Sequence, residues 1–206
     1  MISRSKKFIF IHIPKTAGNS IAFALKRFSE DTFYWSDGTI GEIRSKYNTK
    51  KHSTLLRYRK YVRGISRYTT FSVIRNPFDR AISLYFYGLK YWHKSDKHLD
   101  KEIDIEVLKK ILDTQLGRTQ FRYLQAGGFL KVDYLLRFES LNEDFKSICK
   151  VLKLDTELPI RLPVTNVGSH KPYQYYYEEC DYGYEAFKIV RDKYVKDLDV
   201  FGYSYK

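Results

Sequence analysis

The sequence has no hydrophobic run long enough to cross a bilayer. Its early apolar stretch, Phe8–Ile13, covers only a fraction of the ~20 residues that a membrane-spanning helix needs. No small-residue cleavage site follows this stretch. The sequence therefore predicts neither a signal peptide nor a membrane anchor, and the default location is the cytoplasm.

Cysteine is scarce. The chain has only Cys149 and Cys180, too few for a disulfide framework or a zinc site. Cys149 shares an apolar helical face with Phe145, Ile148 and Leu152. We therefore expect Cys149 to be a buried, reduced thiol.

Acidic residues are outnumbered by basic ones, 24 to 37, which gives a formal net charge of +13. Such an excess attracts anions: nucleic acid, acidic polysaccharide, anionic lipid or a phosphorylated cofactor. The basic residues form no compact tail, and no zinc-finger, helix-turn-helix or RNA-recognition signature is present. A basic nucleic-acid-binding module stays open as an alternative that rests on charge and aromatic content.

No repeat, low-complexity tract or linker divides the 206 residues, so we expect one domain, residues 1–206. Three segments are typical of strands: Phe8–Ile13, Thr69–Ile74 and Val132–Phe138. They alternate with helical patterns, which predicts an α/β fold whose central parallel sheet is flanked by helices. Helices are expected near residues 21–28, 53–63, 76–89, 103–112, 118–126, 140–152 and 183–198. Residues 31–51 are expected to form a loop, and Ser140 to open its helix with a capping box.

The segment Ile13–Ser20, IPKTAGNS, joins the first strand to a helix. Backbone N–H groups at a helix N-terminus are unpaired and attract anions. Gly18 lets an anion approach the backbone, Thr16, Asn19 and Ser20 add side-chain donors, and Lys15 adds a positive charge. This segment, called the anion loop below, is also compatible with a plain turn that carries a solvated lysine.

A second polar segment follows the second strand. Arg75 ends that strand, Asn76 and Pro77 start a helix, and Ser83 lies two turns along it. Arg75 and Ser83 can converge on one phosphate, to which the planar guanidinium is suited. Arg80 has either a structural role or contributes charge nearby. Alone, the segment is also compatible with a capped helix and a surface arginine.

Together, Ile13-Pro-Lys-Thr-Ala-Gly-Asn-Ser20 and Arg75-Asn-Pro-Phe-Asp-Arg-Ala-Ile-Ser-Leu-Tyr85 closely resemble the two cofactor motifs of the PAPS-dependent sulfotransferases, specifically the carbohydrate-type family 2 branch. The second motif matches throughout. The first departs at Asn19, where that family usually has Thr or Ser. Weaker similarities are HST at 52–54 and TQFRYL at 119–124.

The resemblance implies a three-layer, P-loop-like fold and in-line transfer of a sulfuryl group from PAPS (3′-phosphoadenosine 5′-phosphosulfate). The acceptor would be a hydroxyl of a carbohydrate or glycoconjugate, and the product adenosine 3′,5′-bisphosphate. Arg75 and Ser83 would bind the 3′-phosphate, and Lys15 would be catalytic. The cradle for the phosphosulfate would be lined by Lys15, Thr16, Ala17, Gly18, Asn19 and Ser20.

A hydroxyl acceptor also needs a general base. The histidines are His12, His52, His93, His98 and His170. We select His52, because its His-x-Thr/Ser context matches the base position of the family. His12, at the end of the first strand, is the second choice, and a surface or packed histidine is the alternative for each.

A P-loop-type small-molecule kinase is the main competing enzyme. Such kinases hold Mg²⁺ with a Ser/Thr after the loop lysine and often with an Asp at a strand end. Here Lys15 precedes the glycine, and no strand ends in an obvious magnesium-binding Asp. We expect no metal requirement, no nucleic acid partner and no stable membrane insertion. A relative that binds PAPS without transferring sulfate also stays open. Nothing in the sequence names the sugar or the oligomeric state.

Overall fold

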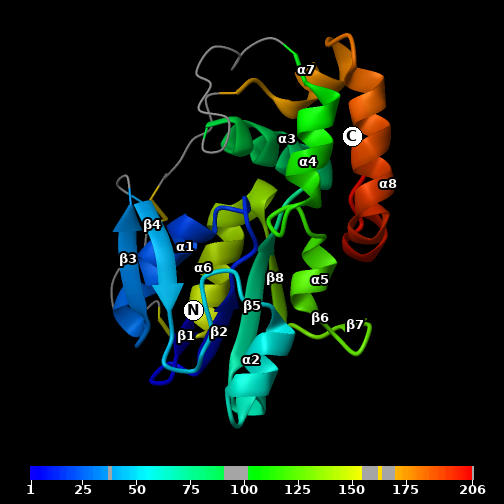
Figure 1. The fold of residues 1–206 in the computed structure, drawn as a ribbon. Helices are drawn as coiled ribbons and strands as arrows, with labels where there is room; N and C mark the ends of the chain where they lie inside the picture. The colour runs from blue at the N-terminus through cyan, green and yellow to red at the C-terminus, as the bar shows by residue number, and fades with distance from the viewer. Residues whose placement is uncertain (37–38, 91–101, 155–161, 164–169, 206) are drawn as a thin grey trace. The chain divides into compact units, whose positions relative to one another are not determined.

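The computed structural model describes residues 1–36, 39–90, 102–154, 162–163 and 170–205 (Figure 1). Contacts divide the chain into two compact units: residues 1–74 with 122–166, and residues 75–121 with 167–206. We call them the sheet unit and the helical unit, and each is described by itself. His93 and His98 lie outside the described residues.

A four-stranded sheet in the order β1-β2-β5-β8 organises the sheet unit (Figure 1). β2 (Phe8–Ile11), β5 (Thr69–Ile74) and β8 (Tyr134–Arg137) are parallel. This confirms the three predicted strands and the mixed α/β fold with a central, mostly parallel sheet. A short β1 (Ile2–Ser3), which was not predicted, adds an antiparallel edge.

One face of this sheet carries the apolar core of the unit. The strands contribute Phe8, Phe10, Phe71 and Val73 to it, and all four are buried. Helices α1 (Gly18–Leu25) and α6 (Leu141–Val151) pack on the same core (Figure 1). Cys149 of α6 is a buried thiol and not part of a disulfide, as predicted. Because parallel strands end at one edge, the segments that follow β2 and β5 both start from the same edge of the sheet.

Residues 31–51 are not a loop as expected, since they contain a hairpin of β3 (Thr32–Ser36) and β4 (Thr39–Arg44). The correction has a packing reason. Ile40 and Ile43 of β4 are buried in the sheet-unit core, and Phe33 packs against it. The hairpin thus buries apolar groups that a loop would leave in water.

The sheet unit also contains short elements, some of which differ from the prediction. They are the 3-10 helices η1 (Lys26–Phe28), η2 (Ile65–Arg67) and η4 (Phe138–Ser140), helix α2 (Leu55–Tyr61), and strands β6 (Gln125–Ala126) and β7 (Phe129–Leu130). The predicted capping box at Ser140 is not formed. The Ser140 side chain caps no backbone N–H and instead donates to Asp144 Oδ2 at 3.1 Å.

The helical unit is built from α3 (Pro77–Gly88), α4 (Ile105–Asp113), α7 (Tyr173–Glu178) and α8 (Gly183–Phe201), while α5 (Gln120–Leu124) spans the boundary between the units. The start of α3 confirms the prediction, because Asn76 Oδ1 accepts from the Phe78 N–H at 3.0 Å and Pro77 is the first helical residue. In the described part of the chain, no helix has the length and apolar character needed to cross a membrane.

Arg80 lies in the interior of the helical unit and is fully buried. Its Nη2 donates to the Leu116 carbonyl at 2.8 Å, and its guanidinium lies 5.6 Å from the ring centroid of Tyr194. A buried cation is tolerated only when such polar partners replace water. The contacts support the structural role for Arg80 rather than the role of a nearby charge.

Replacing Arg80 by Ala should therefore lower the free energy of unfolding by roughly 3–5 kcal/mol, because the substitution leaves a cavity and an unpaired carbonyl. Urea denaturation measures the loss. Arg191→Ala on the exposed surface of α8 is the matched control and should change stability by under ~0.5 kcal/mol. Equal stability of the two variants would contradict the structural role.

Candidate functional site

The anion loop connects β2 to α1 through two residues in the left-handed region. Lys15 has a φ of 65° and Ala17, the N-cap of α1, a φ of 59°. Non-glycine residues in this region cost roughly 1–2 kcal/mol each. Thr16 lies between them, is fully buried, and donates its hydroxyl to the Ile13 carbonyl at 3.0 Å. The Thr16 side chain therefore stabilises the loop conformation through a hydrogen bond inside the loop.

The first turn of α1 has the properties of an anion site. No side chain caps this turn, and it contains no acidic residue. The positive end of the helix dipole and the backbone N–H groups at Gly18 and Asn19 are therefore not neutralised by a carboxylate of the turn. Strained loops that present successive N–H groups are a common way to bind phosphate-like anions.

Gly18 is required at its position by close packing. A Cβ built on Gly18 would lie 2.1 Å from Cδ2 and 2.2 Å from Nε2 of His12. The His12 ring is 3% exposed, so it has little room to withdraw. The contact fixes the backbone at the start of α1 against the end of β2.

His12 itself is a buried, neutral ring. Burial, with a smaller effect from His52, holds the pKa of His12 well below its usual value near 6.5. Its Nδ1 is buried and has no hydrogen-bond partner among the described residues. The ring stacks on Phe10 with 5.6 Å between centroids. His12 thus acts as a spacer between the sheet and the anion loop.

His52, the predicted base, lies beside His12, the residue that directly precedes the anion loop. Its ring centroid is 4.7 Å from that of His12, and its Nδ1 is 3.0 Å from the His12 carbonyl oxygen. A carbonyl can only accept, so Nδ1 of His52 carries the proton, and in the neutral ring Nε2 carries the lone pair. This is the tautomer that a general base at Nε2 requires.

The segment around His52 is anchored at further points. The Lys51 ammonium donates to the Ile40 carbonyl of β4, and burial lowers the pKa of Lys51 to about 8. The Lys50 N–H donates to Ser53 Oγ at 2.8 Å. Thr54 caps α2 by accepting from the Arg57 N–H at 3.3 Å. The hairpin, missed by the sequence prediction, therefore helps to hold the candidate base.

The second predicted group, in the helical unit, centres on Arg75. Its Nε donates to Asp79 Oδ2 at 2.7 Å, and its side chain is 11% exposed. Asp79 lies in the first turn of α3, and Ser83 follows it by four residues, on the same helix face. Arg75 contacts Asp79, and Ser83 lies one turn further along the same face of α3; their convergence on one phosphate stays a prediction.

Sequence reasoning missed several polar residues that support Arg75. They are Asp79, Gln120 and Asp197, all of which hydrogen-bond within the helical unit. Asp79 lies inside the predicted motif, and Gln120 lies in the TQFRYL similarity. Asp197 is far along the chain, and its local sequence carries no signal of this role.

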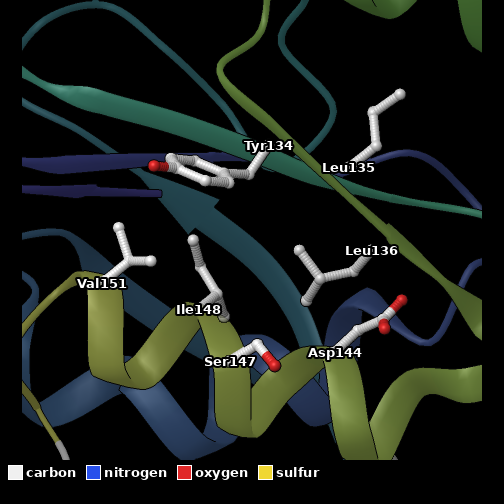
Figure 2. A pocket seen from close by; sticks show the side chains of 7 residues that line it. All are labelled: Tyr134, Leu135, Leu136, Asp144, Ser147, Ile148 and Val151. Carbon is white, nitrogen blue, oxygen red and sulfur yellow. The ribbon is translucent and has the colours of Figure 1, made fainter.

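A pocket of about 140 Å³ lies elsewhere in the sheet unit, between β8 and α6 (Figure 2). It is lined by Tyr134, Leu135, Leu136, Asp144, Ser147, Ile148 and Val151. In Figure 2 the side chains of Leu136 and Ile148 point into the space between strand and helix. The lining contains no residue of the anion loop, and neither His52 nor Arg75. The described residues also contain no group of three His, Cys, Asp or Glu side chains that could hold a metal ion.

Comparison with known proteins gives one match, to a protein family, that covers nearly the whole chain. The model of a family described as "Sulfotransferase family" matches residues 1–204, which includes both units. No curated protein and no solved structure matches the chain.

The buried, neutral His12 predicts a specific pH dependence of stability. The folded state holds the pKa below the unfolded value near 6.5, so the unfolded state binds more protons as the pH falls. Stability is therefore lost below pH 6.5, by up to ~1.4 kcal/mol per pH unit. His12→Phe, which keeps a ring on Gly18, should flatten the dependence by that amount in urea denaturation. Parallel pH profiles for wild type and variant would contradict the buried neutral state.

Proposed function

Because the chain belongs to the sulfotransferase family, we propose that it transfers a sulfuryl group from PAPS to a hydroxyl of a carbohydrate or glycoconjugate. The observation that carries the proposal is the anion loop, which leads into an uncapped helix N-terminus and follows directly on His12, whose carbonyl holds His52 in the base tautomer. We propose that the whole chain forms one sulfotransferase domain of the three-layer, P-loop-like type. A cytoplasmic location stays a prediction from the sequence.

The anion loop is proposed to bind the 5′-phosphosulfate. Gly18 supports this role indirectly, since its missing side chain lets the His12 ring pack against the start of α1 and hold it in place. The N–H groups of Ala17 and Gly18 would line the cradle, and Thr16, Asn19 and Ser20 would complete it. Lys15 would neutralise the charge that develops on the bridging oxygen as its bond to sulfur breaks.

Arg75 and Ser83 are proposed to bind the 3′-phosphate of PAPS. Their common side of α3 and the ion pair between Arg75 and Asp79 support the assignment. An arginine whose Nε is held by a carboxylate is oriented before the phosphate binds, so less entropy is lost on binding. The 3′-phosphate distinguishes PAPS from most adenine nucleotides.

His52 is proposed as the general base. Its Nε2 would take the proton of the acceptor hydroxyl while the acceptor oxygen bonds to sulfur and the bridging oxygen leaves. Its hydrogen bond to the His12 carbonyl supports the required tautomer. His12 is the weaker candidate, because its ring is buried and burial disfavours its protonated form.

The competing functions are less well supported. A kinase would need Mg²⁺ near the loop, and Lys15 stands before the glycine rather than after it. A sulfuryl group carries less charge than a phosphoryl group, so we propose that Lys15 and backbone donors suffice without a metal. A nucleic-acid-binding module rests on the net charge of +13.

Lys15→Ala should lower kcat for sulfate transfer by ~10²–10³, the range for loss of one transition-state charge contact. Lys153→Ala is a matched control, because Lys153 is exposed and also has a positive φ, 54°. The control should transfer at the wild-type rate. Wild-type kcat in Lys15→Ala would contradict the role of Lys15 even if the enzyme class were right.

His52→Ala should lower kcat by ~10²–10⁴, the range for loss of a general base, and leave the affinity for adenosine 3′,5′-bisphosphate unchanged. His170→Ala is the control, since His170 also lies within hydrogen-bond distance of a carbonyl through Nδ1, that of Lys171 at 2.8 Å. Loss of kcat on replacing His12 but not His52 would reverse the assignment.

A further inference from the structure

Gln120 makes two hydrogen bonds to the backbone of Arg75. The Arg75 N–H donates to Gln120 Oε1 at 2.9 Å, and Gln120 Nε2 donates to the Arg75 carbonyl at 2.8 Å. The two bonds fix the orientation of the amide group. Gln120 is fully buried, so water cannot replace either bond when it is lost.

Asp197 of α8 binds the backbone of Gln120. Its Oδ2 accepts from the Gln120 N–H at 2.7 Å, and its Oδ1 accepts from the Phe121 N–H at 2.8 Å. Asp197 is itself fully buried. Burial raises the pKa of Asp197, while these two N–H groups and Arg80 oppose that shift. The start of α5 is therefore fixed to α8 by a carboxylate with both oxygens used.

The chain of contacts runs from Asp197 through Gln120 to the backbone of Arg75, and the side chain of Arg75 is held by Asp79. We infer that Gln120 and Asp197 are positioning residues for the nucleotide 3′-phosphate, acting through Arg75. The inference rests on the proposed function, in which Arg75 binds the 3′-phosphate. It assigns Gln120 and Asp197 a role in nucleotide recognition that is exerted through Arg75.

The physical basis is the geometric demand of the guanidinium group. A planar fork binds phosphate well only when its position and plane are set. Asp79 orients the Arg75 side chain through its Nε, but the position of that side chain also depends on the position of the Arg75 backbone. A backbone held by two buried hydrogen bonds keeps this point fixed, and a freed backbone would spread the guanidinium over more positions.

The test compares binding of adenosine 3′,5′-bisphosphate and adenosine 5′-phosphate by calorimetry. Gln120→Glu keeps the shape but turns the Nε2 donor into an acceptor that faces the Arg75 carbonyl. It should weaken bisphosphate binding about tenfold, the effect of one buried unpaired group, and leave adenosine 5′-phosphate binding unchanged. Gln115→Glu, the same change at an exposed position in the segment between α4 and α5, should alter neither affinity.

Asp197→Asn provides a second variant, because it places an amide N–H against one of the two backbone donors. It should reduce the preference for the bisphosphate in the same direction, and Asp199→Asn, on the exposed surface of α8, is its control. Hydrogen exchange of the wild-type protein needs no variant. The bisphosphate should slow exchange at the Gln120 and Phe121 amides more than adenosine 5′-phosphate does.

The outcomes separate this inference from the function on which it rests. Wild type that fails to prefer the bisphosphate, or Arg75→Ala that keeps the preference, would overturn the assignment of Arg75 and this inference with it. A folded Gln120→Glu that keeps the full preference, or loses both affinities equally, would overturn the positioning role alone. Equal protection of the two amides by both nucleotides would do the same.

Discussion

The contact between the His12 ring and the backbone of Gly18 is the constraint on which the candidate site depends. The ring occupies the space that any larger residue at position 18 would need. The carbonyl of the same His12 accepts from His52. One residue directly after β2 thus sets both the start of α1, where an anion is expected, and the tautomer of the candidate base. The cost is a buried histidine with an unpaired Nδ1 among the described residues.

The sheet explains why this residue has such influence. β2 is buried on both faces and pairs with β5 in parallel, so its carboxyl end is held firmly before the chain turns. The turn itself is strained at Lys15 and Ala17, and strain of this kind persists only where the surrounding structure enforces it. Because the chain belongs to the sulfotransferase family, we propose that the strained loop serves to bind the sulfuryl donor.

Local signals in the sequence were sufficient for the elements next to the site. Thr69–Ile74 forms a strand with the predicted bounds, and the Asn76 cap with Pro77 starts α3 as predicted. Both depend on residues adjacent in the chain. The hairpin at 32–44 was missed, although Asp37-Gly38 between two apolar segments is a known hairpin signal. Its burial depends on Ile40 and Ile43 reaching the sheet-unit core.

Long-range contacts could not be predicted. Gln120 and Asp197 are separated by 77 positions, and nothing local in either segment indicates the pairing. Arg80 was ambiguous for the same reason, since its burial depends on Leu116 and Tyr194. The roles of Lys15, His52, Arg75 and Ser83 stay predictions, because the motifs indicate chemistry and the structure supplies only their surroundings.

The most direct test of the central claim is transfer of labelled sulfate from PAPS to a panel of glycans by the wild-type protein. Parallel reactions contain labelled ATP with Mg²⁺ in place of PAPS, and a binding assay contains an oligonucleotide. We expect labelled sulfate on at least one glycan, with no added metal and no phosphate transfer from ATP. Absence of binding to both PAPS and adenosine 3′,5′-bisphosphate would contradict the account.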